Sequence, residues 1–517
     1  MKKKINHILP ALVLTASLGL TTVSCNGFLD EMPDNRTELN TDQKIAKLLV
    51  SAYADVSPNE LFELYSDNSD DSGPTYGYYK LSEQECYHWQ DTKEEYQDTP
   101  NSLWGGYYSA IAAANMALDA IEEKGNPASL DPQRGEALVC RAYCHFMLAN
   151  IFCNAYDTHA SQSLGVPYME EVETTVSPRY ERGTLEEVYR KVERDLLEGI
   201  DLISDDSYSV PKYHFTRKAA YAFAARFYLY YMKPDFSNCD RVIDFATRVL
   251  GTNPADLLRN WEALGNLSVN GNVQADAYIA SSNEANLLIS STVSNWGAIG
   301  SDYLIGPRYF HNQTLATSET CLSSGLWGSS DYFYLKPFST NGFVASILRK
   351  SGLYEGTYLY YMPVLFSTDE TLLCRAEAYA LKKMYAQSAA DITSWQRAYT
   401  RNKSVLTPEQ INTYYDKMSF YTPFTQQTPK KKLAPDFMIE EGMQENFIHC
   451  ILHIRRITTL HEGMRWPDIK RYGILIYRRD MANQRVTDEM PPNDLRYAIQ
   501  IPRSVIVAGI QPNPRRN

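Results

Sequence analysis

The sequence predicts a mainly α-helical protein, in which degenerate helical hairpins of the tetratricopeptide type form a scaffold for long irregular insertions. Three observations predict this fold. Several segments carry apolar residues at the helical spacing, they follow one another in pairs joined by short turns, and Ala, Tyr and Leu occupy the expected contacts. No strict repeat of about 34 residues is present, so we expect about four diverged helical pairs.

Seven segments carry the helical pattern. They are residues 104–121, 134–151, 185–203, 221–231, 242–249, 372–379 and 389–397. Thr184 and Glu187 form a capping box before the third segment, because each side chain can satisfy a backbone amide of the other residue. Thr216 is the expected cap of the fourth segment, and Gly251 is the expected end of the fifth.

Two stretches, residues 252–360 and 400–440, lack a sustained period and are rich in Ser, Gly, Asn, Thr, Gln and aromatic residues. Structureless loops of this length are rare in a compact domain, so we expect irregular elaborations packed on the scaffold, where binding sites tend to lie. The scaffold itself is expected over residues 41–251 and 368–398, and a C-terminal segment covers residues 445–517.

Composition limits the function. The chain has 517 residues, of which 44% are hydrophobic and 22% charged, as in ordinary globular proteins. Its net charge of -12 argues against a nucleic-acid partner, because binding to phosphates requires a basic surface. The 38 Tyr, 18 Phe and 7 Trp residues supply many flat apolar faces with polar edges, which suit recognition surfaces as well as cores.

The N-terminus predicts export. Three lysines precede the apolar stretch from Ile8 to Leu20, which is too short to span a bilayer comfortably, so residues 1–24 are interpreted as a signal peptide. Small residues lead directly to Cys25, as in a bacterial lipobox, where the cysteine thiol is diacylated with palmitate-type chains. Residues 25–40 would then be a lipidated tether for a single body over residues 41–517. The alternative is an ordinary secretory signal with a chance cysteine.

Charged motifs have structural interpretations that we favour over functional ones. Arg465 and Arg471 lie in a charged run, and we expect both to make bidentate ion pairs that hold it to neighbouring helices. The acidic segment Asp67, Asn68, Asp70 and Asp71 has Ca²⁺-ligand chemistry, but a solvated turn is the preferred interpretation, so we predict no metal site and no required cofactor. The cysteines after residue 25 are expected to be buried free thiols.

No Walker A loop, dinucleotide fingerprint or nucleophile elbow occurs in the sequence. We therefore predict no catalytic residues and no enzyme activity. A glycosidase-type pair of carboxylates stays open, because the distance between such groups is set in space rather than in sequence.

Short motifs follow one another through the chain. They are Cys25 with Phe28, Leu29 and Asp30; Trp104, Tyr107, Ile111 and Asn115; Gly135, Glu136, Ala137, Arg141, Ala142 and Tyr143; Gly165, Val166 and Pro167; Thr184, Val188, Tyr189, Asp195 and Leu196; Leu372 to Ala378; Glu462 to Gly473; and Ile501, Pro502, Asn513 and Pro514. In this order, the motifs resemble those of the SusD/RagB-like outer-membrane nutrient-binding lipoproteins, and the resemblance runs through most of the chain.

The resemblance implies a non-catalytic lipoprotein of the outer membrane, facing the exterior, that binds an oligosaccharide. It also implies a partner, a SusC-like TonB-dependent barrel that imports the bound nutrient. The RagB-like members of the family suggest the alternative of a peptide-binding receptor with the same partner. A lipid-anchored hydrolase is the third hypothesis, from a different functional class.

Sugar binding requires exposed aromatic rings, because the C–H face of a pyranose packs on such a ring while polar neighbours bond its hydroxyls. Candidates must lie outside the helical stripes. Our candidate ligand-binding residues are Trp89, Trp296, Trp327, Tyr79 and Tyr332. For any single one of them, ordinary packing in the core remains the competing interpretation.

Overall fold

The computed structural model describes residues 39–75, 80–175, 179–268, 273–299, 308–320, 325–329, 332–334, 352–355 and 358–515. Residues Asn40–Asn517 form one compact unit. The expected signal peptide, the lipidation site Cys25, nearly all of the tether and the candidate Tyr79 lie outside the described residues.

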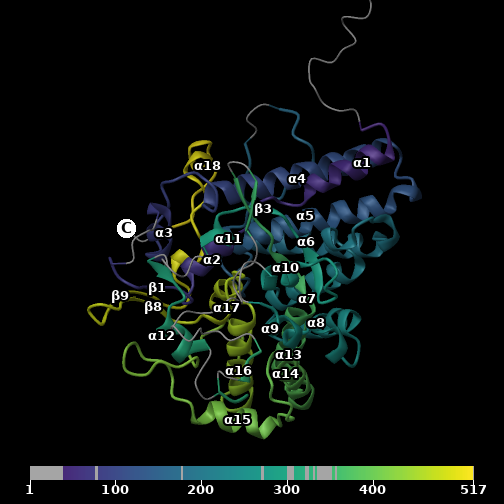
Figure 1. Cartoon of the computed structure of the whole chain (residues 1–517). Helices are drawn as coiled ribbons and strands as arrows, with labels where there is room; N and C mark the ends of the chain where they lie inside the picture. Colours follow the sequence, from purple (N-terminus) through teal and green to yellow (C-terminus); the bar gives the residue numbers. More distant parts are fainter. Residues whose placement is uncertain are drawn as a thin grey trace, which may run out of the picture. The chain divides into compact units, whose positions relative to one another are not determined.

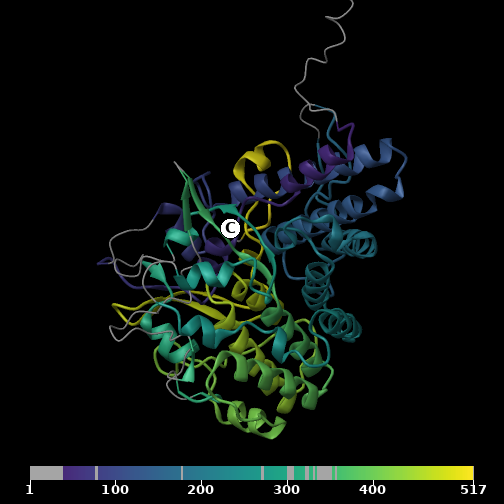
Figure 2. The same cartoon turned by 45° about the vertical axis from the view of Figure 1, so that its right-hand side comes forward.

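A succession of packed helices forms the scaffold. They are α4 (Pro100–Glu123), α5 (Asp131–Phe152), α6 (Leu185–Leu202), α7 (Arg217–Tyr230), α8 (Ser237–Leu250), α13 (Thr368–Leu381) and α14 (Tyr385–Tyr399). Helix α5 packs between α4 and α6, α8 packs between α7 and α13, and α14 packs on α13. Figures 1 and 2 show α4, α5 and α6 lying side by side, with the later pairs continuing the array.

Shorter helices and a C-terminal layer complete the α-helical part. They are α1 (Asp42–Leu49), α2 (Asn59–Tyr65), α3 (Leu81–Tyr87), α9 (Trp261–Gly265), α10 (Val273–Ile279), α11 (Trp296–Ile299), α12 (Gln313–Leu315), α15 (Pro408–Lys417), α16 (Met443–Thr458), α17 (Arg465–Tyr472) and α18 (Arg503–Val507). Helix α16 packs on both α13 and α15. Among the described helices, none is both long and apolar enough for a bilayer crossing.

Within the described residues, three small sheets join distant parts of the chain. The largest has the order β4 (Tyr309–Phe310), β1 (Asp70–Asp71), β8 (Ile476–Asp480) and β9 (Arg485–Met490). Strand β1 is antiparallel to β4 and parallel to β8, with Asp71 opposite Asp480. The other sheets pair β2 (Asn286–Ile289) with β7 (Val364–Ser367), and β3 (Thr292–Val293) with β6 (Tyr358–Tyr361) and β5 (Gly352–Glu355).

The ends of the scaffold helices follow the expected caps. The Thr184 hydroxyl accepts from the Glu187 amide at 3.2 Å, and the Glu187 carboxylate accepts from the Thr184 amide at 2.8 Å, which is the complete capping box. Thr216 accepts from the Ala219 amide. Gly251 ends α8 at a φ of +63°, a conformation that favours glycine. All three predicted caps are therefore confirmed.

Helix α5 is central because both of its sides are covered. Every residue from Gly135 to Phe152 is buried, as expected of a helix that is enclosed on all sides. Its start meets α6 at a glycine pair: a Cβ added to Gly135 would lie 2.8 Å from the carbonyl oxygen of Gly199. Neither glycine tolerates a side chain without movement of the two helices, so the pair sets their close approach.

The expected fold class is confirmed, since the described structure is mainly α-helical and its helices cover all seven predicted segments. The aperiodic stretch 400–440 contains one helix that the pattern missed, α15. It has a capping box at Thr407 and Gln410, but only Ile411 and Tyr415 are buried, which is too few positions for a visible stripe. The seven cysteines within the described ranges are free and buried, as predicted.

Candidate functional site

A cluster of ion pairs lies where β1, β8 and α16 meet the insertions; we call it the charged network. Its members are Asp67, Asp70, Glu319, Lys431, Arg456, Arg465 and Arg479, all of which are buried. Arg465 makes a bidentate pair with Asp67, with its Nε and Nη2 atoms at 2.7 and 2.9 Å from the two carboxylate oxygens. Lys431 Nζ donates to the same carboxylate at 2.6 Å.

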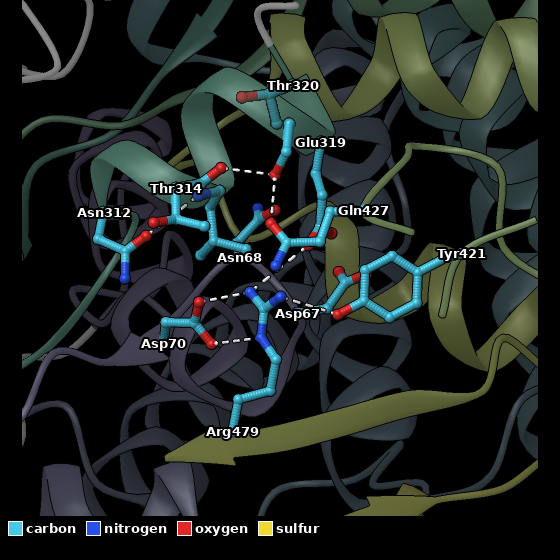
Figure 3. A network of polar contacts seen from close by, with 12 residues as sticks. Asp67, Asn68, Asp70, Asn312, Thr314, Glu319, Thr320, Tyr421, Gln427 and Arg479 are labelled. Atoms are coloured by element: carbon cyan, nitrogen blue, oxygen red, sulfur yellow. Dashed lines mark hydrogen bonds and ion pairs between the residues drawn. The ribbon is translucent and has the colours of Figure 1, made fainter. Parts of the chain in front are cut away.

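Strand pairing brings the second half of the network together. Because β1 lies beside β8, Asp70 meets Arg479, and the two form a bidentate pair (Figure 3). Glu319, from the turn after α12, lies 2.9 Å from Arg456 Nη1 and 2.9 Å from Lys431 Nζ. The network therefore joins the chain between α2 and β1, the insertion around residue 319, and the C-terminal segment.

The cations keep two of the network's carboxylates, Asp67 and Glu319, ionised, whereas burial raises the pKa of the third, Asp70, in spite of its pair with Arg479. Burial alone would raise the pKa of Asp67, but Arg456, Arg465 and Lys431 lower it well below its ordinary value. Burial likewise opposes ionisation of Glu319, and Lys431, Arg456 and Arg479 overcome it and lower its pKa to about 2. Near neutral pH, both groups are fixed charges that position their partners.

A group of partly exposed polar and aromatic residues adjoins the charged network through Tyr421, and we call it the polar rim. Its members are Asn312, Thr314, Ser318, Tyr421, Gln427 and Tyr477. Asn312 Oδ1 accepts from the Leu315 amide at 3.0 Å and caps α12. Ser318 Oγ donates to Gln427 Oε1 at 3.1 Å, so the α12 turn is tied to the segment that carries Tyr421 (Figure 3). Within the described residues, the amide nitrogens of Asn312 and Gln427 have no hydrogen-bond partner.

The rim carries two tyrosine rings that the network holds in place. Tyr421 and Tyr477 stack with their centroids 6.1 Å apart and their planes at 28°. Arg479 donates to the Tyr421 hydroxyl at 2.8 Å, and Lys431 Nζ lies 4.2 Å from the centre of its ring. Chemically, the rim combines two partly exposed tyrosine side chains with neutral amide and hydroxyl groups, a combination that suits a polyhydroxylated ligand.

The three tryptophans chosen from the sequence lie in the core instead of on an open surface. The Trp89 indole donates to the Tyr65 carbonyl at 2.9 Å, and Arg478 stacks 4.0 Å from its ring. The Trp296 indole donates to the His461 carbonyl at 2.9 Å. Trp327 has no exposed surface, because it packs against Trp395. In this structure, the three rings offer no open face for stacking.

Tyr332 is the exception among the candidates within the described residues. Its side chain is 45% exposed, so it stays a prediction for ligand contact. The structure does not bring it into the polar rim by any contact between the described residues. The rim aromatics Tyr421 and Tyr477 were missed by the sequence analysis, and the only signal for them was the location of Tyr421 in the aperiodic stretch 400–440.

The acidic segment differs from both sequence interpretations. It is neither a solvated turn nor a cation site: Asp67 and Asp70 are buried against arginines, and Asp71 makes a bidentate pair with Arg308 at 2.7 Å for both bonds. Their carboxylate oxygens therefore already face cations. Across the part of the chain that the structure describes, no group of three or more His, Cys, Asp or Glu residues is arranged to hold a metal ion.

The structural role predicted for Arg465 and Arg471 is confirmed. Arg465 pairs with Asp67 as described above. Arg471 donates to both oxygens of Glu377 on α13, at 2.8 and 3.4 Å, and also pairs with Asp468. The two arginines therefore hold α17 to α13 and to the segment that follows α2.

Residues 27–229 match a family model described as SusD-like, starch-binding and associating with the outer membrane. A SusD superfamily protein from Bacteroides fragilis has the same fold, with a TM-score of 0.64 and 15% identity over 91% of this chain and 98% of that chain. A putative sugar-binding protein from Bacteroides vulgatus gives a TM-score of 0.62 and 21% identity over 92% and 99% of the two chains.

A SusD-like carbohydrate-binding protein from Bacteroides vulgatus is also similar, with a TM-score of 0.57 and 15% identity over 90% of this chain and 96% of that chain. At these identities, the solved structures establish the fold alone. No curated protein matches the sequence.

The helical-hairpin scaffold with its irregular insertions thus defines a protein of the SusD-like fold class. The match over residues 27–229 goes further than the fold, and it confirms the expected resemblance to the SusD-like family in that part of the chain. The family is associated with the outer membrane, and its description as starch-binding indicates carbohydrate binding.

Proposed function

We propose that this protein binds a nutrient oligosaccharide at the polar rim and does not transform it. The observation that carries the proposal is the rim itself: Tyr421 and Tyr477 stack, and Ser318 ties the α12 turn to Gln427 in the segment that carries Tyr421. Among the described residues, the amide nitrogens of Asn312 and Gln427 are unpaired. Sugar rings pack on aromatic faces, and amides bond their hydroxyls. The carboxylates of the charged network are held by cations, which suits them to positioning the rim rather than to proton transfer.

The proposal includes the cellular setting. Cys25 carries the lipid anchor, the protein faces the exterior, and a SusC-like TonB-dependent barrel receives the bound oligosaccharide. The lipobox-like leader and the SusD-like family support this assignment. Two or more acyl chains on one residue make stable anchoring feasible.

Calorimetric titration of the detergent-solubilised full chain with maltoheptaose and xylohexaose tests ligand binding. We expect Tyr421→Ala and Gln427→Ala each to weaken binding by more than about tenfold, a loss of about 1.4 kcal/mol. Gln426→Ala is the matched control, because its side chain is exposed beside the rim and makes no hydrogen bond among the described residues. Rim variants that bind like the wild type would refute the site.

The same titrations separate the alternative functions. If neither glycan gives a binding signal in the calorimeter and a mixed peptide digest does, the protein is the peptide-binding receptor of the alternative hypothesis. Shortening of maltoheptaose during prolonged incubation, detected by chromatography, would make it a hydrolase instead.

The anchor is tested in a host that lacks the barrel. We expect Cys25→Ala to move the protein from the membrane fraction to the soluble fraction, because the acylated thiol is lost. Cys86→Ala is the control, since Cys86 is a buried free thiol. Retention of Cys25→Ala in the membrane fraction would contradict the proposed anchor.

A further inference from the structure

A hollow of about 480 Å³ opens in the helical scaffold and shares no lining residue with the polar rim. We call it the scaffold hollow. It lies between the turn at Val50–Ala52, helix α4, the turn at Pro211–Tyr213 and the chain after β2. Its volume falls within the range of small-molecule sites, which is roughly 300–1,000 Å³.

One wall of the scaffold hollow carries a histidine that is held in one orientation. His214 Nδ1 lies 2.7 Å from Glu136 Oε1, and the Tyr208 ring stacks on the His214 ring with centroids 4.5 Å apart. The Tyr53 hydroxyl donates to the same Glu136 oxygen at 2.7 Å and accepts from the Phe215 amide at 2.7 Å. Glu136 and Tyr208 contact the imidazole directly, and Tyr53 holds the Glu136 carboxylate, so the orientation of the ring is fixed.

These contacts determine the tautomer of His214. A carboxylate oxygen only accepts hydrogen bonds, so the hydrogen of a neutral His214 is on Nδ1 and a lone pair is on Nε2. Within the described part of the chain, Nε2 has no hydrogen-bond partner, and His214 lines the hollow. His214 Nε2 is therefore a free acceptor atom on a residue of the hollow's wall.

The remaining lining defines the chemistry of the ligand. Tyr213 is 36% exposed and offers a ring, and Ser109 and Ser291 offer exposed hydroxyls. No Lys or Arg is among the described residues that line the hollow, and Asp55 is its charged member. Such a lining disfavours an anion and favours a neutral ligand that carries hydroxyl donors.

We propose that the scaffold hollow is a second binding site, for a neutral sugar of one or two rings, in which His214 Nε2 accepts a hydrogen bond from a ligand hydroxyl. The site is for binding and not for nucleophilic catalysis. Among the described serines, none has its Oγ within hydrogen-bond distance of His214, so no relay to a nucleophile is assembled.

The proposal is tested by nitrogen-15 NMR of the histidine-labelled full chain, titrated with glucose, galactose, xylose, N-acetylglucosamine and maltose. We expect the His214 spectrum to show the Nδ1–H tautomer, and its Nε2 resonance to shift with at least one of these sugars. His214→Gln assigns the signal. No shift of Nε2 with any of the five sugars would overturn the proposal.

A filling variant separates this site from the rim. Ser291→Trp places a large side chain at the hollow and leaves the His214–Glu136 contact intact, so we expect it to weaken binding of the small sugar by more than about tenfold. Ser281→Trp, on an exposed turn outside the lining, is the matched control. If Tyr421→Ala no longer binds the small sugar and Ser291→Trp binds it like the wild type, the sugar binds at the rim and the second site is refuted.

Discussion

Replacing Asp67 by asparagine removes one charge from the centre of the charged network and leaves the shape of the side chain almost unchanged. In the wild type, its two oxygens accept from Arg465 and Lys431 at 2.6 to 2.9 Å, and Arg456 lies 3.7 Å away. The asparagine keeps one oxygen and turns an NH₂ group toward these cations. Arg465 then loses its paired carboxylate, and Lys431 and Arg456 keep only that of Glu319.

The expected cost follows from this geometry. Hydrogen bonds to charged groups contribute about 1.5–3 kcal/mol each, and removal of one member of a buried ion pair costs about 3–5 kcal/mol. Because several contacts are lost together and are not additive, we expect a loss of about 3–5 kcal/mol for Asp67→Asn. Domain stabilities are about 5–15 kcal/mol, so this loss is a large fraction of the total.

Urea unfolding followed by circular dichroism measures the effect as a fall in the transition midpoint. Asp42→Asn is the matched control, because Asp42 is 60% exposed and lies 3.7 Å from Lys124, and we expect it to cost under about 1 kcal/mol. If Asp67→Asn unfolds at the same urea concentration as Asp42→Asn, the network does not stabilise the fold and our reasoning is wrong.

Three further predictions concern single positions. The folded pKa of Glu319, about 2, is below its ordinary value of 4.5, so its contribution to stability is present above pH 4.5 and is lost as the pH falls toward 2. Glu319→Gln should therefore remove a stabilisation on the order of 3 kcal/mol and flatten this acid dependence, measured by urea unfolding at each pH. Burial lowers the pKa of Lys470 from 10.5 to about 7, so the folded state binds fewer protons than the unfolded state, and the free energy of unfolding should rise between pH 7 and 10.5. A Lys470→Met variant whose free energy of unfolding rises equally steeply with pH would contradict this. Thr184→Ala should cost about 1 kcal/mol, read from the urea midpoint, because the capping box is lost, whereas no change would show that α6 does not depend on its cap.

Local signals in the sequence predicted the scaffold well. Capping at Thr184 and Thr216 involves residues three positions apart, and the helical stripes involve spacings of three and four, so both are readable without knowledge of the fold. The carboxylate partner of Arg465 in the charged network could not be predicted from the sequence. Asp67 lies 398 positions away, and sequence alone showed only that such an arginine needs a carboxylate.

The candidate site was predicted less well than the scaffold. Trp89 and Trp327 have the ring chemistry that sugars require, but exposure depends on the tertiary packing, and both rings are buried. Tyr421 and Tyr477 stack because the segment before Lys430 folds back against β8. No local pattern connects these two tyrosines, so the rim emerges only from the three-dimensional structure.

The parallel contact between β1 and β8 has a consequence for how the protein matures. Strand β1 leaves the ribosome early, but its neighbour Asp480 and the arginine that holds Asp70 are among the last residues to be made. Until then, Asp70 lacks its bidentate partner, and the platform beneath the tyrosines is incomplete. A chain that is truncated before residue 477 would keep most of its hairpins but would lack Tyr477 and Arg479, and with them the proposed ligand surface.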